Sequence, residues 1–279
     1  MIEVELISSD YEIQDDIFIF HKDIAELNED YNASGLDLLH KFEETHFWFL
    51  SRRELIYRIL QKYIRKGESI LETGAGTGNT SAYLISKGYT DLAVSDMHAS
   101  GLEYARRYGL ERLYQFDLMR TPFKDEFDVV LMFDVIEHIE DDSKALQQAG
   151  GMLHHDGVVV LTVPAHQWLW HEGDVQSGHK RRYNKKQLKS LLIKSGFEPL
   201  YVRYFFMSLV PFLLIRRMYS SCMKSEDNIS QHKNERASGL RINPIVNAVL
   251  RTITRIDNML LPIIPNICGG SIIVVGRKT

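Results

Sequence analysis

The chain has 279 residues, of which 44% are apolar, 25% charged and 10% aromatic, which excludes a disordered, collagen-like or rod-shaped protein. The formal net charge of −4 conceals an asymmetry: residues 1–175 hold 15 Lys+Arg against 32 Asp+Glu, and residues 176–279 hold 18 against 5. We therefore expect the C-terminal third to face an anionic partner (nucleic acid, phospholipid or a phosphorylated substrate) or the acidic part of its own chain.

Three features of the sequence favour a cytoplasmic location. The first residues carry acids where a secretory signal carries bases, so we expect no signal peptide. The longest apolar stretch, Phe205–Ile215, contains Pro211 and is well short of the ~20 residues that span a bilayer. Two cysteines, Cys222 and Cys268, are too few for a disulfide framework and favour a reducing compartment.

Apolar residues at three-to-four spacing predict that residues 10–66 are helical, up to Gly67. Beyond Gly67, short apolar runs alternate with amphipathic ones, which is typical of a parallel sheet covered by helices. The predicted strands are Ser69–Thr73, Asp91–Ser95, Leu113–Phe116, Phe127–Phe133, Val158–Val163, Phe197–Phe206 and Ser271–Gly276. The predicted helices between them are Asn79–Lys87, Ala99–Arg107, Ser143–Leu153 and Lys185–Ser195.

An insert interrupts this alternation before the last strand. Its part Ser220–Gly239 is polar, which predicts a mobile loop. Pro244–Leu261 has helical apolar spacing, and we expect it to pack beside Leu209–Ile215. The chain then divides into a helical N-terminal segment or lid (1–66), an α/β core (67–206), the insert (207–269) and a final strand of the core (270–279).

A glycine-rich turn, Glu72-Thr73-Gly74-Ala75-Gly76-Thr77-Gly78, lies between a predicted strand and a predicted helix. Glycines let the backbone turn tightly and approach a ligand, and the helix that follows begins with unpaired N–H groups. The spacing is G-x-G-x-G, and Asn79 stands where the dinucleotide fingerprint needs a glycine. The spacing therefore counts against NAD or FAD as the ligand.

Two further acids end the next strands, Asp96 after the second and Asp117 after the third. Carboxylates at this edge of an open parallel sheet can accept hydrogen bonds from both ribose hydroxyls. We expect Glu72, Asp96 and Asp117 to converge on one crevice at the carboxyl ends of the strands.

With these motifs the chain resembles the class I S-adenosylmethionine-dependent methyltransferases, in particular the small-molecule group with an E/D-x-G-x-G-x-G first motif. The resemblance covers roughly residues 66–206 and the last strand. It also rests on Val94-Ser95-Asp96, Gln115-Phe116-Asp117-Leu118, Phe127-Asp128-Val129-Val130 and Phe133-Asp134-Val135-Ile136-Glu137-His138-Ile139. It implies a Rossmann-like α/β fold with a seven-stranded, mostly parallel sheet and a reversed last strand. His154-His155-Asp156-Gly157 replaces the Pro-Gly-Gly turn that the family often has before its fifth strand.

The resemblance also implies where S-adenosylmethionine binds and S-adenosylhomocysteine is released. The cofactor would lie across residues 72–78, which include Glu72, Thr73, Gly74, Gly76 and Gly78. Asp96 would hold the ribose and Asp117 the adenine amino group, Met97 and Leu118 would sandwich the ring, and Phe133-Asp134 would lie beneath the methionine end. In related enzymes the N-terminal segment closes the site, so Trp48 would cover cofactor or substrate and Arg52 would reach the cofactor carboxylate. Packing of Trp48 in the core is the alternative.

Three histidines follow the fifth predicted strand, namely His166, His171 and His179. An imidazole has a pKa near physiological pH and can act as general base for the acceptor, and His166 is the first candidate because it is nearest to the strand end. Loop packing is the alternative for each.

Asp134, Glu137 and His138, with His166 as a fourth ligand, form an alternative divalent-metal site that would orient a substrate oxygen. This set resembles the metal-assisted 2′-O-methyltransferases of small RNA and the quinone O-methyltransferases. The alternative is that Glu137 and His138 only cap and pack, with no metal bound.

Six bases and no acid lie between Lys180 and Lys189, which by default indicates a solvated helix face. The nearby apolar segment Tyr204–Ile215 is followed by Arg216-Arg217, and apolar insertion with basic flanks is typical of contact with an anionic membrane. Burial against Pro244–Leu261 is the competing interpretation.

The leading hypothesis is a methyltransferase that acts on oxygen or nitrogen of a small acceptor, which is lipid-linked or phosphate-bearing. Its location would be the cytoplasm or the inner face of the membrane. RNA methylation is an alternative, although only Tyr183 supplies an aromatic ring within the basic run, which makes a nucleic-acid partner the weaker hypothesis. A cofactor-binding scaffold without catalysis is another alternative.

Overall fold

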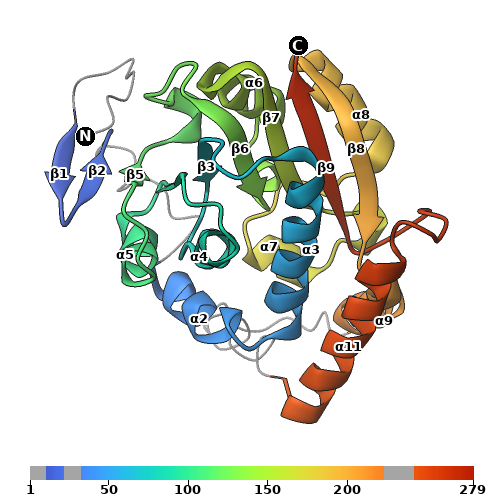
Figure 1. Cartoon of the computed structure of the whole chain (residues 1–279). Coiled ribbons are helices and arrows are strands. Elements are labelled where there is room, and N and C mark those ends of the chain that lie inside the picture. Colours follow the sequence, from blue (N-terminus) through green and yellow to red (C-terminus); the bar gives the residue numbers. More distant parts are fainter. Residues whose placement is uncertain (1–10, 22–32, 223–241) are drawn as a thin grey trace.

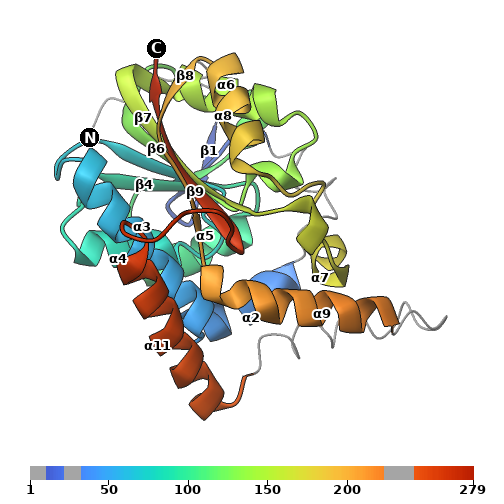
Figure 2. The same ribbon diagram turned by 90° about the vertical axis from the view of Figure 1, so that its right-hand side faces the viewer.

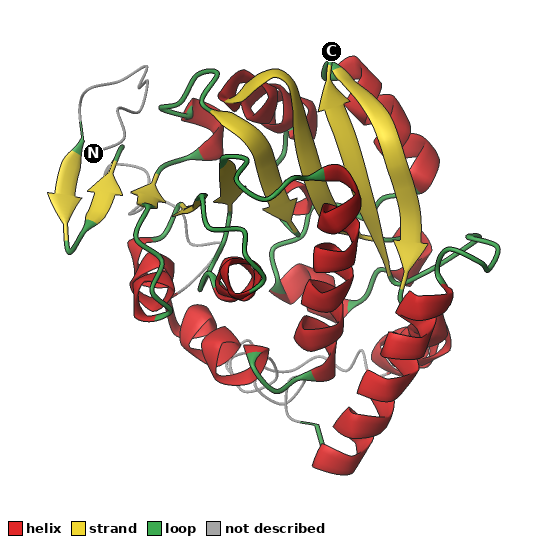
Figure 3. Ribbon diagram, in the orientation of Figure 1, coloured by secondary structure: helices red, strands yellow, loops and turns green. Residues whose placement is uncertain are grey.

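The computed structural model describes residues 11–21, 33–222 and 242–279, which form a nine-stranded sheet in the order β1-β2-β5-β4-β3-β6-β7-β9-β8 (Figures 1 and 3). From β5 to β7 neighbouring strands are parallel, and β9 is antiparallel to both β7 and β8. The reversed last strand is therefore confirmed. These strands are β3 (Ile70–Thr73), β4 (Leu92–Asp96), β5 (Leu113–Gln115), β6 (Phe127–Phe133), β7 (Leu153–Pro164), β8 (Phe197–Phe205) and β9 (Ser271–Lys278).

Helices cover both faces of the sheet, because its strands are apolar on both sides and must be buried on both. One apolar core joins the sheet to α3 (Phe47–Tyr63), α4 (Asn79–Ser86) and α5 (Ala99–Arg107). The other joins it to α6 (Asp142–Met152) and α8 (Lys185–Lys194). The other helices within the described residues are α2 (Ala33–Glu43), α7 (Glu172–Gln176), α9 (Val210–Cys222) and α11 (Pro244–Leu260), with short turns η1 (Leu118–Arg120), η2 (Ile136–His138), η3 (Gln167–Leu169) and η4 (Met207–Leu209).

The prediction of seven strands was too low, because part of the segment predicted as helical pairs with the sheet. β1 (Glu12–Gln14) and β2 (Ile17–Ile19) form a hairpin, and β2 runs parallel to β5. Asp15 and Asp16 turn the chain with φ values of 50° and 64°, a left-handed conformation that Asp tolerates in tight turns. Ile17 and Ile19 are buried at the edge of the sheet, whereas α2 and α3 confirm the helical prediction farther along.

β7 begins five residues earlier than predicted. Leu153 pairs with Phe127 and Val158 with Val129, so residues 154–157 bulge out of the pairing with β6. Three of these four residues are exposed, and Asp156 has φ 63°. The predicted turn before this strand is thus a bulge within it.

The insert packs partly as predicted. α11 lies along α3, and it also contacts η4, which includes Leu209 and where Ser208 donates to Asp257 (Figure 2). Phe205 and Phe206, which we considered for membrane insertion, are core residues at 1% exposure. Most of the predicted loop Ser220–Gly239 lies outside the described residues. In the described parts of the chain, no helix has the length and apolarity needed to cross a membrane.

Candidate active site

The glycine-rich turn follows β3 and leads into α4, as predicted. Gly74, Gly76 and Gly78 have φ values of 70°, 56° and 74°, which side-chain-bearing residues rarely adopt. The turn also packs tightly on α5: a Cβ atom added to Gly101 would lie 2.4 Å from the carbonyl oxygen of Gly76. The backbone of the turn is therefore fixed from behind by α5.

Asp96, at the end of β4, connects this strand to the turn. Gly76 N–H donates to Asp96 Oδ2 at 2.8 Å, and His98 N–H donates to Oδ1 at 2.9 Å. Enclosure of the carboxyl raises its pKa, and the hydrogen bonds from His98 and Gly76 oppose that rise. The carboxylate thus lies at the turn, where the resemblance places the ribose.

The other two acids also end adjacent strands, but their side chains make separate local bonds. Glu72 is buried and accepts a hydrogen bond from Ser81 of α4, and burial raises the pKa of Glu72 to about 7. Asp117 caps η1 by accepting from Met119 N–H at 2.9 Å. Thr73 and Leu118 are buried, whereas Met97 is half-buried.

The N-terminal helices cover the glycine-rich turn. The periodicity of the sequence predicted these helices but not their position over the turn. Leu36 and Leu39 of α2 lie within van der Waals distance of a Cβ built on Gly76. Glu43, at the end of α2, accepts a hydrogen bond from Thr77, and burial raises the pKa of Glu43 to about 7. Glu43 was missed because a single acid in an amphipathic helix carries no distinguishing signal.

Arg52 connects α3 to the residue that follows β6. Its guanidinium forms an ion pair with Asp134 Oδ2, and it lies 4.7 Å from the centroid of the Trp48 ring and 5.9 Å from that of Phe133. Thr162 Oγ1 donates to Asp134 Oδ1 at 3.0 Å. Four of the residues singled out from the sequence, Trp48, Arg52, Phe133 and Asp134, are therefore in one cluster.

Carboxyl groups outnumber bases around this cluster. Arg52 lowers the pKa of Glu43, Glu72 and Glu137 electrostatically, but burial outweighs it and the pKa of each is raised. Asp134 is a fourth carboxyl, and it forms an ion pair with the same guanidinium. Such an environment suits a ligand that adds positive charge.

The predicted catalytic histidines occupy different environments. The ring of His166 stacks on Tyr204 with centroids 4.6 Å apart and contacts Trp168. Its Nε2 is buried without a hydrogen-bond partner among the described residues. Burial, and then the charge of Arg182, lower the pKa of His166, which keeps the ring neutral.

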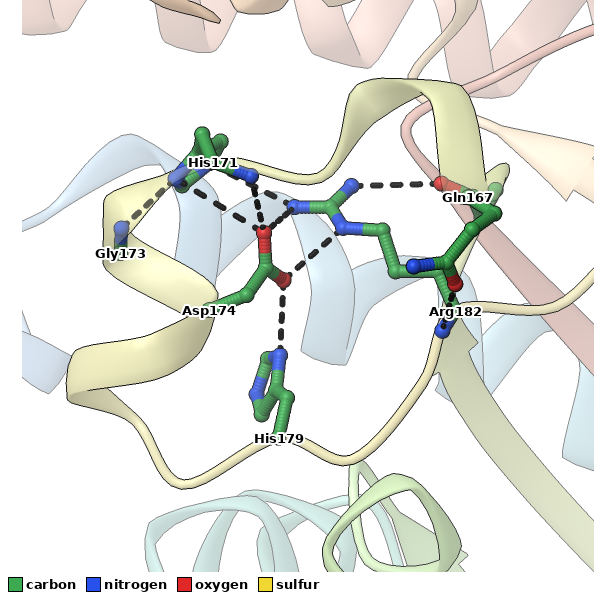
Figure 4. A network of polar contacts seen from close by, with 7 residues as sticks. Gln167, His171, Gly173, Asp174, His179 and Arg182 are labelled. Carbon is green, nitrogen blue, oxygen red and sulfur yellow. Dashed lines mark hydrogen bonds and ion pairs between the residues drawn. The ribbon is translucent and has the colours of Figure 1, made fainter. Parts of the chain in front are cut away.

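His171 and His179 belong to a network centred on Asp174, a residue that the sequence analysis missed (Figure 4). Arg182 Nε and Nη2 each donate to one Asp174 oxygen at 2.8 Å, and His179 Nδ1 lies 2.8 Å from Oδ1. His171 caps α7 by accepting from Gly173 N–H. Burial opposes ionisation of Asp174, yet the hydrogen bonds from His179 and Arg182 prevail and lower its pKa to about 2.

Glu137, His138 and His179 form a separate group whose potential ligand atoms all lie within 4.8 Å of one another. Glu137 is fully buried, and neither carboxylate oxygen has a hydrogen-bond partner among the described residues. Burial, and then the charge of Asp134, raise the pKa of Glu137 well above its ordinary value. The structure thus brings the predicted pair Glu137 and His138 to His179, whereas His166 lies against Tyr204 and Asp134 against Arg52.

Half of the basic run serves the fold. Arg182 binds Asp174, Arg181 binds Asp142 at 3.1 Å, and the Lys185 ammonium donates to Asn266. Three bases of the run, Arg181, Arg182 and Lys186, line a cavity of about 580 Å³ that also reaches Lys194. None of the residues that line this cavity belongs to the glycine turn, so the cavity and the turn are separate candidate sites.

Comparison with known proteins identifies the family. A family described as a methyltransferase domain matches residues 45–202, which is more than half of the chain and includes the glycine turn and the Arg52–Asp134 pair. The chain belongs to this methyltransferase family. This is the family that the sequence motifs predict, and curated relatives are named as probable S-adenosylmethionine-dependent methyltransferases.

Curated relatives of this methyltransferase match it in part. A probable S-adenosylmethionine-dependent methyltransferase of Mycobacterium tuberculosis is 28% identical over 156 residues, which are 54% of this chain and 56% of that protein. A ubiquinone biosynthesis O-methyltransferase of Actinobacillus pleuropneumoniae is 28% identical over 107 residues, which are 34% of this chain and 45% of that protein. The matched region of the chain thus spans about half the length of these relatives.

A solved structure confirms the Rossmann-like fold. Phosphoethanolamine N-methyltransferase 2 of Haemonchus contortus, in complex with S-adenosyl-L-methionine, superposes with a TM-score of 0.58 at 20% identity. The superposition covers 90% of this methyltransferase and 58% of that chain. At this identity the similarity concerns the fold.

Proposed function

We propose that the protein transfers a methyl group from S-adenosylmethionine to an oxygen or nitrogen of a small acceptor that is lipid-linked or phosphate-bearing. The observation that carries the proposal is the excess of carboxyls beside the glycine turn, where Arg52 pairs with Asp134 and acts electrostatically on Glu43 and Glu72, and Arg53 also acts on Glu43. This charge balance suits a sulfonium, which is positive until its methyl group leaves.

The residues present fit the cofactor. The glycines of the turn carry no side chains and have left-handed φ angles, and Gly101 packs against the carbonyl oxygen of Gly76. Asp96 accepts a hydrogen bond from the N–H of Gly76. In the proposal, the cofactor-binding set is Glu72, Thr73, Gly74, Gly76, Gly78, Asp96, Met97, Asp117, Leu118, Phe133, Asp134, Trp48 and Arg52. When bound, the cofactor supplies an activated methyl group, so the chain has to position the acceptor, exclude water and remove a proton.

We assign the general base to His166 rather than to His171 or His179. Its buried, unpartnered Nε2 and lowered pKa keep a neutral acceptor nitrogen available, whereas the other two histidines are bound to the Asp174 network. A general base contributes about 10²–10⁴-fold to the rate. His166→Ala should lower kcat by that factor and leave cofactor affinity unchanged, and an unchanged kcat would remove His166 from this role.

The group of Glu137, His138 and His179 favours oxygen as the methylated atom. Asp174 can accept a hydrogen bond from His179 Nδ1, which leaves the other ring nitrogen to a metal, a common arrangement around metal-bound histidines. A divalent cation held by these three residues would polarise an acceptor oxygen and give Glu137 its missing partners. Calorimetric titration with Mn²⁺ should give binding that Glu137→Gln abolishes, and equal heats in both proteins would exclude the site.

The direct experiment measures S-adenosylhomocysteine release with a panel of acceptors. Because one partial relative is named for ubiquinone biosynthesis and the solved structure for phosphoethanolamine, the panel contains catechols, phosphoethanolamine and their lipid-linked forms. Release with one acceptor class, lost in Asp96→Ala, supports the proposal. Release with RNA alone would favour the alternative substrate, and cofactor binding without any release would favour a scaffold.

A further inference from the structure

Helix α11 carries its apolar side chains on the outside of the protein. Ile245, Val249, Ile256 and Met259 are 75%, 52%, 52% and 62% exposed, whereas Thr254, Asp257 and Asn258 are buried at 8% exposure or less. An amphipathic helix on a globular protein normally buries its apolar face. Burial between Pro244–Leu261 and Tyr204–Ile215 was one of two interpretations that the sequence left open, and in the structure these four apolar side chains are exposed.

Hydrogen bonds between α11 and the chain around α3 fix this orientation. Ser51 Oγ and Thr254 Oγ1 are 2.7 Å apart, and Asn258 Nδ2 donates to the Ser51 carbonyl at 3.0 Å. At the other end of α11, Asn247 Oδ1 accepts from Phe47 N–H at 2.8 Å. Rotating α11 to bury its apolar side would leave these polar groups without partners, so the outward orientation is the stable one.

Further apolar side chains are exposed beside α11, on α9 and on the segment between α11 and β9. Both helices lie in front in Figure 2, which views this side of the molecule. We call the whole set the apolar face, and it consists of Phe212, Ile215, Met218, Ile245, Val246, Val249, Ile256, Met259, Leu260, Ile263 and Ile267. Six of these side chains belong to the single helix α11, and so many exposed apolar side chains on one helix indicate a docking surface or an aggregation hazard.

The charges on the two helices of the apolar face are basic. α9 carries Arg216 and Arg217, α11 carries Arg251 and Arg255, and the only acid in either helix, Asp257, is buried. Arg251 and Arg255 reach Glu54 of α3 and remain 41% and 53% exposed. A second copy of the chain would bring like charges together, whereas an anionic lipid surface satisfies both the apolar side chains and the bases.

We infer that the apolar face docks the protein on an anionic lipid bilayer, with α11 lying in the plane of the interface. α11 is bound to Ser51, and the next residue, Arg52, lies in the candidate active site. Docking of α11 therefore places α3, which covers the site, near the membrane. Under the proposed function, docking brings a lipid-linked acceptor to that site. Membrane binding itself does not depend on the proposed function.

The test is co-sedimentation of the full chain with phosphatidylcholine vesicles and with vesicles that contain equal parts of phosphatidylcholine and phosphatidylglycerol. The face variant is Ile245→Glu with Ile256→Glu. The control variant is Val175→Glu with Ile193→Glu, which adds the same charge at residues that are 57% and 64% exposed on other helices. We expect the wild-type chain and the control to bind the anionic vesicles, and the face variant to bind at least tenfold more weakly.

A wild-type chain that stays in the supernatant, or a face variant that sediments as well as the control, overturns the inference. A wild-type dimer that the face variant converts to monomer, without vesicle binding, would assign the face to a second copy instead. S-adenosylhomocysteine binding, measured on the same preparations, verifies that each variant is folded. If no preparation, wild type included, binds S-adenosylhomocysteine, the proposed function is contradicted. The vesicle result then still decides whether the apolar face binds membrane.

Discussion

The ion pair between Arg52 and Asp134 joins a helix of the N-terminal segment to the end of a central strand. Both side chains are mostly buried, at 12% and 20% exposure, and Trp48 and Phe133 flank the guanidinium. The covering helix and the sheet are thus connected at the point where the proposed methyl transfer takes place.

Removal of the Arg52 guanidinium should weaken cofactor binding. Arg52→Ala leaves Asp134 without its cation and frees α3 from β6, and we expect the Kd for S-adenosylmethionine to rise about tenfold or more. Arg58→Ala is the control, because Arg58 is exposed on the same helix. Equal affinities of the two variants in isothermal titration would contradict the assignment of Arg52 to the site.

The close approach of α5 to the glycine turn predicts a specific effect at Gly101. Its Cβ in Gly101→Ala would meet the Gly76 carbonyl oxygen, a backbone atom, so the turn has to move and cofactor affinity should fall at least tenfold. In the control Gly151→Ala, the Cβ meets nothing within 4 Å on helix α6, and a gain in stability of about 0.5–1 kcal/mol is expected. Thermal unfolding and cofactor titration of both variants measure these effects, and unchanged affinity in Gly101→Ala would refute the prediction.

Affinity for S-adenosylmethionine should rise with pH through about 7. Burial raises the pKa of Glu43 and of Glu72 to about 7 in the cofactor-free protein. A bound sulfonium favours the ionised carboxylates, so binding releases protons below this pH and becomes tighter as the pH rises through it. S-adenosylhomocysteine, whose sulfur is neutral, should show a weaker dependence. Parallel slopes for the two ligands between pH 6 and pH 8 would contradict this account.

Asp174 should be a determinant of stability. Asp174→Asn leaves the buried Arg182 without its carboxylate, which typically costs about 3–5 kcal/mol, whereas Glu172→Gln at an exposed neighbour should cost little. The pKa of Asp174 is lowered to about 2, below its unfolded value of about 3.9. Its stabilisation is therefore complete above pH ~4 and is lost as the pH falls towards 2. Urea unfolding at pH 7 and pH 3 measures both effects, and equal stability of the two variants at pH 7 would exclude this role.

The glycine turn, the strand-end acids and most of the core strands could be predicted from the sequence because their signals are local. Asp96 lies where spacing along the chain predicts it, and Gly76 has the backbone conformation that its residue type permits. β1 and β2 could not be predicted, because three-residue strands depend on pairing with β5, which is distant in sequence.

Two other features depend on contacts that no sequence window contains. Asp174 acquires its role only when Arg182 folds back onto it. The apolar spacing of α11 predicted a helix, but the hydrogen bonds that join Thr254 and Asn258 to Ser51 determine which face is buried. Periodicity identifies an amphipathic helix and leaves open whether protein or another medium covers its apolar side.

Isothermal titration of the purified chain with S-adenosylhomocysteine tests the central claim most directly. Saturable binding at one site per chain, lost or at least tenfold weaker in Asp96→Ala, is the predicted result, because that carboxylate holds the turn at Gly76. The absence of saturable heat in the wild-type protein, or the same Kd in Asp96→Ala, would contradict the assignment of the cofactor to this turn.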